Sequence, residues 1–215
     1  MLKVYLDAAD GMAGLGQVAV WAFDLDVWGE CAQAADDDAA LAAFAKRVGR
    51  TDLLVVERIV GAQQVFARDR EPARPEEVAA TIRLVRDHRA ATLALIEQAD
   101  AAGALDVQDE SVAQPAWMPW RTPRAIAQHL VDDAAGGYLR RLGLPTRPPS
   151  GALIPDLRAS AAHLERVLRD LPPDRVTEYR GEVWTSVKLL RRQTWHERVE
   201  QVFLRRRLRA AGVVC

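Results

Sequence analysis

Residues 181–209, GEVWTSVKLLRRQTWHERVEQVFLRRRLR, have the length of a long helix and contain no glycine or proline after Gly181. A helix advances about 100° per residue, which gathers four apolar side chains on one face: Leu189, Val199, Phe203 and Leu204. The opposite face is basic and carries Arg191, Arg198, Arg205 and Arg209. The stretch therefore predicts an amphipathic helix whose apolar side faces a protein core.

Two polar residues, His196 and Glu200, fall in the middle of that apolar stripe at the spacing i, i+4. A buried polar group without a partner costs of order 2–7 kcal/mol, and a charged one costs more. A divalent cation would compensate the carboxylate, because two side chains at this spacing chelate one ion from a single helix. The residues alone leave a second interpretation open, in which His196 is a hydrogen-bonded core residue and Glu200 pairs with an arginine.

The composition is that of a globular protein with one large or two small domains: 215 residues, 49% hydrophobic, 27% charged and a formal charge of -1. This balance predicts no nucleic-acid partner, and the basic helix face is interpreted as solvated. No apolar run approaches the about 18 residues of a membrane span, and no signal peptide opens the chain, so a cytoplasmic protein without a membrane partner is expected. Cys31 and Cys215 are too few for a disulfide scaffold, and Cys31 is predicted to be a small buried hydrophobe rather than a reactive thiol.

The first 65 residues predict a small α+β domain. Strand-forming runs and one helix with an acidic start alternate with turns in the order β-β-β-α-β, over residues 2–8, 17–25, 28–34, 36–48 and 51–60. The stretch FDLDVWGECAQAADDDAALAAF weakly resembles the HicB-type small domain, although the Pro-Gly turn usual in that pattern is missing near Asp26 and Val27. The resemblance implies a fold for this region and no function.

A polar connector with Pro72 and Pro75 leads into a second domain, predicted at residues 75–212. Four amphipathic helices are expected there with no strand between them, and DRVTEYRGEVW is expected to be a connector. The helices are expected at 75–101, from Thr122 to Gly143, after Pro155 with Asp156 as the cap, and at the opening segment. Their long connections favour a four-helix bundle with a crossover. The sixteen-residue loop LDVQDESVAQPAWMPW, which holds Trp117 and Trp120, is a candidate cover for a pocket.

Three further histidines could complete a metal site. His129 lies at the margin of the apolar face of the second helix, with Asp133 one turn later, and can point between helices. His88 and His163 lie beside or outside the apolar stripes of their helices, so both are predicted to be surface residues. His129 is therefore the best third candidate.

TPRAIAQHLVDDAAGGYLRRLG, followed by GEVWTSVKLLRRQTWHERVEQVFLRR, resembles the DinB/YfiT-like superfamily of four-helix proteins over about residues 75–210. The resemblance implies a divalent metal, commonly zinc or nickel, bound at positions that match His129, His196 and, in place of the family's third histidine, Glu200. Asp133 and Glu197 could support these ligands or accept a proton. For Glu197 the favoured alternative is a surface carboxylate paired with an arginine.

The resemblance also implies a function. Family members are metal-dependent transferases or isomerases that use a low-molecular-weight thiol such as mycothiol, bacillithiol or glutathione, and a few resemble hydrolases. The expected pocket lies between the second and fourth helices under Trp117 and Trp120, and a homodimer is a further expectation. Two rival hypotheses remain open: a non-catalytic, stress-related binding module with a decayed metal site, and, ranked last, a toxin–antitoxin-like regulator.

Overall fold

The computed structural model describes residues 1–108 and 118–213, which form a mixed α+β fold. They divide into two compact units. Unit 1 consists of Met1–Thr81 and Pro172–Trp195, and unit 2 consists of Ile82–Leu171 and His196–Cys215. The unit boundaries fall inside two long helices, so they differ from the predicted sequence domains 1–65 and 75–212, which stay a prediction.

Unit 1 contains a four-stranded sheet in the order β3-β2-β1-β4, in which β1 and β4 are parallel and the other neighbours antiparallel. The strands are β1 (Leu2–Ala9), β2 (Val18–Trp21), β3 (Cys31–Ala34) and β4 (Leu53–Gly61). Short helical turns occupy α1 (Asp10–Ala13), η1 (Leu25–Val27) and η2 (Arg68–Arg70). The predicted order of three strands, a helix and a strand is confirmed for the longer elements.

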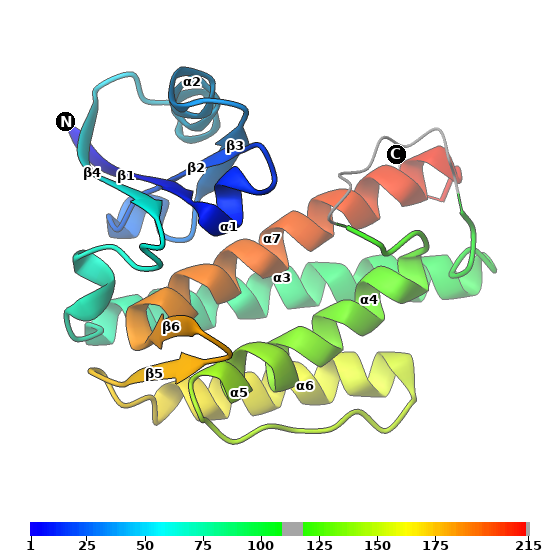
Figure 1. Cartoon of the computed structure of the whole chain (residues 1–215). Coiled ribbons are helices and arrows are strands. Elements are labelled where there is room, and N and C mark those ends of the chain that lie inside the picture. Colours follow the sequence, from blue (N-terminus) through cyan, green and yellow to red (C-terminus); the bar gives the residue numbers. More distant parts are fainter. Residues whose placement is uncertain (109–117, 214–215) are drawn as a thin grey trace. The chain divides into compact units, whose positions relative to one another are not determined.

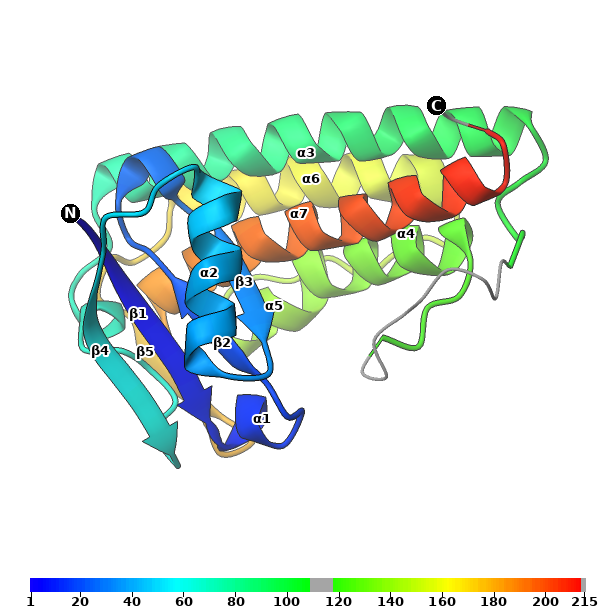
Figure 2. The ribbon, with the colours of Figure 1, turned by 90° about the horizontal axis from the view of Figure 1, so that it is seen from above.

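The helix α2 (Asp37–Val48) packs on one face of this sheet, as Figure 2 shows, with Phe44 fully buried against the strands. Its start and stop follow the sequence signals. The Asp36 carboxylate accepts a hydrogen bond from Ala39 N at 2.8 Å, and Gly49 ends the helix in the left-handed conformation. On the other face of the sheet Cys31 is buried beside Trp21 and Phe66, and burial raises the pKa of its thiol to about 12. The prediction of a buried Cys31 is confirmed.

Residues predicted to be a connector form a β-hairpin in unit 1, which corrects the expectation of no strand beyond residue 75. It consists of β5 (Val176–Tyr179) and β6 (Glu182–Thr185). The two-residue turn, Arg180 and Gly181, has positive φ at both positions, as a type I′ hairpin requires. An Arg-Gly pair is a weaker turn signal than Asn-Gly, which explains why the sequence pattern missed it.

The four long helices of unit 2 lie side by side around one core (Figure 1). They are α3 (Pro75–Ala101), of which unit 2 holds the part from Ile82, α4 (Pro123–Asp132), α6 (Leu153–Arg169) and α7 (Ser186–Ala210), of which it holds the part from His196. Each contributes apolar side chains to the core, among them Ile96, Leu130, Leu157 and Leu204. Within the described ranges, no helix has both the length and the apolar character of a membrane span.

Two helix boundaries differ from the sequence prediction. The second helix is interrupted: α4 leads into a π-helical turn, η3 (Asp133–Gly137), and then α5 (Tyr138–Arg141). The helix α6 begins at Leu153, before Pro155, because the first turn of a helix does not need the N–H group that proline lacks. Asp156 therefore does not cap the helix, and its carboxylate instead accepts hydrogen bonds from Ser150 N at 2.7 Å and Gly151 N at 2.9 Å.

Candidate metal centre

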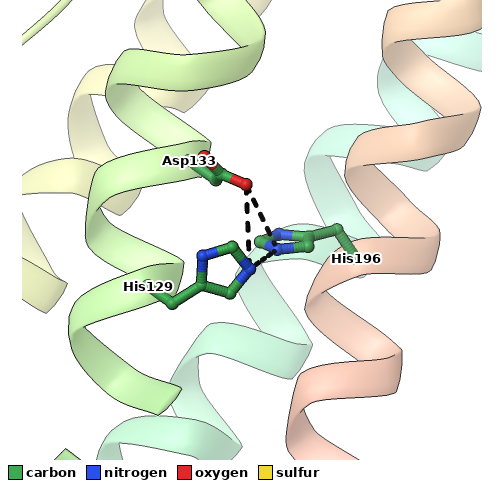
Figure 3. Close-up of side chains that lie close together, drawn as sticks. All are labelled: His129, Asp133 and His196. Atoms are coloured by element: carbon green, nitrogen blue, oxygen red, sulfur yellow. Dashed lines mark hydrogen bonds and ion pairs between the residues drawn. The ribbon is translucent and has the colours of Figure 1, made fainter. Parts of the chain in front are cut away.

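Two histidines from different helices of unit 2 face each other. His129 on α4 and His196 on α7 bring their Nε2 atoms to 2.8 Å (Figure 3). The sequence places His129 there because Thr122 caps α4, accepting from Ala125 N at 3.1 Å, and the apolar residues beside His129 turn that face of the helix into the core. The predicted pairing of these imidazoles is thus present in the geometry.

Asp133 completes a three-residue cluster. Its Oδ2 atom lies 3.7 Å from Nε2 of His129 and 3.9 Å from Nε2 of His196, and Figure 3 shows it directed at both rings. In the part of the chain that the structure describes, the cluster His129, Asp133 and His196 could hold a metal ion. Sequence reasoning had given Asp133 a supporting role, and the geometry places it as near to the imidazoles as a ligand would be.

Glu200 approaches the same cluster from α7. It is 1% exposed, and its Oε1 atom lies 3.7 Å from Nε2 of His129. Its Oε2 atom is buried and accepts no hydrogen bond from the described residues. The structure therefore places Glu200 beside His129, while the group that could hold a metal ion consists of His129, Asp133 and His196.

The donor set fits a divalent cation. Four ligands at about 2.0–2.1 Å from a tetrahedral zinc ion lie about 3.3 Å from one another. In the cluster, Asp133 Oδ2 lies 3.7 Å from Nε2 of His129 and 3.9 Å from Nε2 of His196, so these atoms would move slightly closer around an ion, and the imidazole pair at 2.8 Å would open slightly. The buried, unpartnered Oε2 of Glu200 supports the same conclusion, because an isolated carboxylate is costly in such a place.

The electrostatics of the cluster favour neutral side chains in the absence of a cation. Burial lowers the pKa of His129 to about 4, so its imidazole is neutral near pH 7, as a metal ligand must be. Burial is also the main cause that raises the pKa of Asp133, and it raises the pKa of Glu200 to about 8, with Asp133 and Glu197 adding to the effect. A bound divalent cation would reverse the cost of both carboxylate charges.

Aromatic rings pack against both imidazoles. The Trp120 ring stacks on His129 with centroids 3.5 Å apart and planes at 22°. The Tyr138 ring meets His196 edge to face at 5.2 Å. Trp120 thus covers one face of the His129 imidazole; its role as a pocket cover stays a prediction, and Trp117 lies outside the described residues. Tyr138 was not predicted to lie at the cluster. The feature of the sequence that could have indicated it is its position about one helical turn after Asp133.

Glu197 does not face the cluster and is not the surface carboxylate that the sequence favoured. It is 0% exposed, and Arg89 on α3 donates to both of its oxygens, with Nε at 3.0 Å from Oε2. Arg89 also donates through Nη1 to Ser160 Oγ at 2.7 Å and to Leu157 O at 3.1 Å. The predicted pairing of Glu197 with an arginine is confirmed, and its predicted exposure is wrong. The partner, Arg89, lies within the apolar stripe of α3, so the pair is buried.

The structure also shows the positions of three other residues that the sequence predicted to lie at the surface. His163 is buried, with Nε2 3.0 Å from Pro145 O, because the loop before α6 folds over it, so the surface prediction is wrong. His88 is half-buried and contacts Gln201 Oε1 through Nδ1 at 3.1 Å. Arg191, expected on the outer face of the last helix, is 1% exposed and binds Asp69 in unit 1.

Comparison of the chain with protein-family models, with curated proteins and with solved structures finds no match.

Proposed function

We propose that this chain is a DinB-like enzyme that binds a divalent metal ion between α4 and α7 and uses it to activate a small-molecule thiol. The observation that carries the proposal is the meeting of two imidazoles with one buried carboxylate, Glu200, and one half-buried carboxylate, Asp133, at 2.8–3.9 Å. A transferase or isomerase reaction with a low-molecular-weight thiol, or a related hydrolysis, is the chemistry proposed.

Zinc or nickel is the proposed ion. Imidazole nitrogen and carboxylate oxygen are suitable ligands for both, and three protein ligands leave a position open for a substrate atom. Two sequence motifs on α4 and α7, in the order and spacing of the DinB-like pattern, supply His129 and His196. Four helices around one core are also consistent with this type of bundle.

The bound ion would supply a Lewis acid that lowers the pKa of a coordinated thiol or water. His129 and His196 would hold the ion as neutral donors, and Asp133 would add negative charge. Glu200 would accept the proton that the thiol releases; the buried Oε2 atom, which accepts no hydrogen bond from the described residues, supports this role. Trp120 would keep water from the covered side of His129.

Metal content tests the proposal directly. Protein purified without an affinity tag should contain about one zinc or nickel ion per chain by elemental analysis. His129→Ala and His196→Ala should each weaken zinc binding by about 100-fold or more in competition with a chromophoric chelator, since each loses one of three ligands. His88→Ala is the matched control, because this half-buried histidine of unit 2 lies outside the cluster and should leave the affinity unchanged.

The outcome that would overturn the metal site is a wild-type chain that takes up neither zinc nor nickel at micromolar concentration. Loaded protein should then be incubated with mycothiol, bacillithiol or glutathione and an electrophilic acceptor, and loss of the free thiol followed. A chain that binds metal and consumes no thiol would favour the non-catalytic module over the enzyme.

A further inference from the structure

The π-helical turn η3 carries Asp133 at its first position and two consecutive glycines, Gly136 and Gly137, at its end. Glycine is the poorest helix former after proline, so two in succession inside a helical segment need a reason. A left-handed backbone is not that reason, because Gly137 has ordinary right-handed helical angles, φ -62° and ψ -61°. What sets Gly137 apart is the space that its side chain would fill.

The two glycines differ sharply in that space. A Cβ atom added at Gly137 would lie 2.5 Å from Oδ1 and 3.2 Å from Cγ of Asp133. A Cβ atom added at Gly136 would meet nothing within 4 Å. The Asp133 carboxylate therefore occupies the volume where a side chain of residue 137 would begin.

This packing decides where the carboxylate points. With Oδ1 lying against Gly137, the other oxygen, Oδ2, faces Nε2 of His129 at 3.7 Å and Nε2 of His196 at 3.9 Å (Figure 3). A π-turn inserts one residue into a helix and changes the direction of the side chains around it, and such turns are frequent at functional sites. Here Asp133 and Gly137, the first and last residues of the turn, lie on the same side of it.

We infer that Gly137 is a positioning residue of the metal site: the absence of its side chain lets Asp133 present Oδ2 to the ion, which makes Asp133 the third protein ligand. This inference rests on the proposed metal-binding function and goes beyond it, since it names Asp133 in place of the family-based third position, Glu200. The ligand atoms that lie within 4.8 Å of one another come from His129, Asp133 and His196.

Two neighbouring substitutions test the inference with the same chemical change. Gly137→Ala should displace the Asp133 carboxylate and weaken zinc binding about 10- to 100-fold, the usual effect of disturbing a residue that orients a ligand. Gly136→Ala should leave the zinc affinity within about twofold of the wild type, because its methyl group enters open space. Affinity is measured by chelator competition.

A cobalt-substituted sample and a double variant identify the route of the effect. If Gly137 acts through Asp133, then Gly137→Ala and Asp133→Ala should change the visible absorption bands of the Co²⁺ protein in the same way. Gly137→Ala should also have no further effect on affinity in the Asp133→Ala background, because residues that act through one contact are not additive. A merely structural role of Gly137 would leave the two effects additive.

Each result supports or overturns the inference. A wild-type chain without metal affinity defeats the proposed function itself, whereas normal wild-type binding with equal affinities for Gly137→Ala and Gly136→Ala defeats only the positioning role. If Gly137→Ala does not fold, the double variant with Asp133→Ala should fold, because the clashing carboxylate is gone. Failure of that double variant to fold would overturn the inference.

Discussion

Unit 1 and unit 2 both bury carboxylates, and the two regions neutralise them differently. In unit 1 Asp69 is 0% exposed and receives two hydrogen bonds from the guanidinium of Arg191, at 2.8 and 2.7 Å. In unit 2 Glu200 is 1% exposed, and its Oε1 atom lies 3.7 Å from Nε2 of His129, whose imidazole is neutral near pH 7. Equal burial therefore accompanies an ion pair in one region and a carboxyl group whose ionisation burial opposes in the other.

The contrast also exists within α7, so it does not reflect a general property of either unit. Glu197 and Glu200 are one helical turn apart and equally buried. Arg89 pairs with Glu197, whereas Glu200 has an oxygen that accepts no hydrogen bond from the described residues. A buried carboxylate that pairs with an arginine of the same chain stabilises the fold. A buried carboxylate without such a partner marks a position where a cation from solution can bind.

The largest effect is expected for the balanced pair of unit 1. Arg191→Met should lower the free energy of unfolding by about 3–5 kcal/mol, because it leaves the Asp69 charge buried without a partner. The matched control is Arg86→Met in unit 2, whose side chain is 58% exposed and pairs with Glu165, and it should cost less than about 1 kcal/mol. Urea denaturation measures both values. Similar losses for the two variants would show that burial does not set the importance of these pairs.

A smaller and sharper effect is expected from the same substitution at the two glutamates of α7. Glu197→Gln should destabilise the metal-free protein by about 2–4 kcal/mol, because it leaves the buried Arg89 charge unbalanced. Glu200→Gln should stabilise the metal-free protein by about 1–2 kcal/mol near pH 8, since it removes a carboxylate whose ionisation burial opposes. The measurement is urea denaturation in the presence of a chelator. Destabilisation by both variants would contradict the distinction between them.

Local signals in the sequence were sufficient for most of the elements. The cap at Asp36, the Thr122-Pro123 start and the apolar spacing of α3 predicted helices that the structure contains, with α3 at Pro75–Ala101 as expected. These features depend only on residues that are close in the sequence, so the sequence pattern is sufficient to predict them. The β-hairpin was not predicted, because its turn, Arg180-Gly181, lacks the residues that usually adopt two consecutive positive φ angles.

The candidate site was predictable in part for a related reason. His196 and Glu200 stood out because polar side chains interrupted an apolar stripe, and His129 because it lay at the margin of another. The same criterion applied to α3 would have singled out Arg89, which lies between apolar positions of that helix. Asp133 could not be predicted as a ligand, because the direction of its carboxylate depends on a π-turn and on the missing side chain of Gly137. Regular helical periodicity takes neither feature into account.

The smallest effect concerns another buried cation of unit 1, Lys188, and it depends on pH. Its Nζ atom donates to Glu182 Oε1 at 2.8 Å, Val183 O at 2.8 Å and Gln64 O at 3.1 Å, yet burial lowers its pKa from 10.5 to about 8, with a smaller contribution in the same direction from Arg191 and Arg192. Between pH 8 and 10.5 the unfolded chain therefore binds more protons at this position than the folded chain does. Stability contributed by this residue must rise with pH across that window.

Lys188→Met isolates this contribution, because cysteine and tyrosine ionisation affects the variant and the wild type alike. The wild type should gain about 1 kcal/mol relative to Lys188→Met between pH 8 and 10.5, less than the full shift would give, since the three acceptors still favour the charged amine. Urea denaturation at several pH values measures the difference. A difference that stays constant with pH would mean that Glu182 balances Lys188 as fully as Asp69 balances Arg191, and it would extend the rule of paired buried charges to the whole of unit 1. A difference that falls with pH would mean that the ion pair outweighs burial, and the direction of the pKa shift would then be wrong.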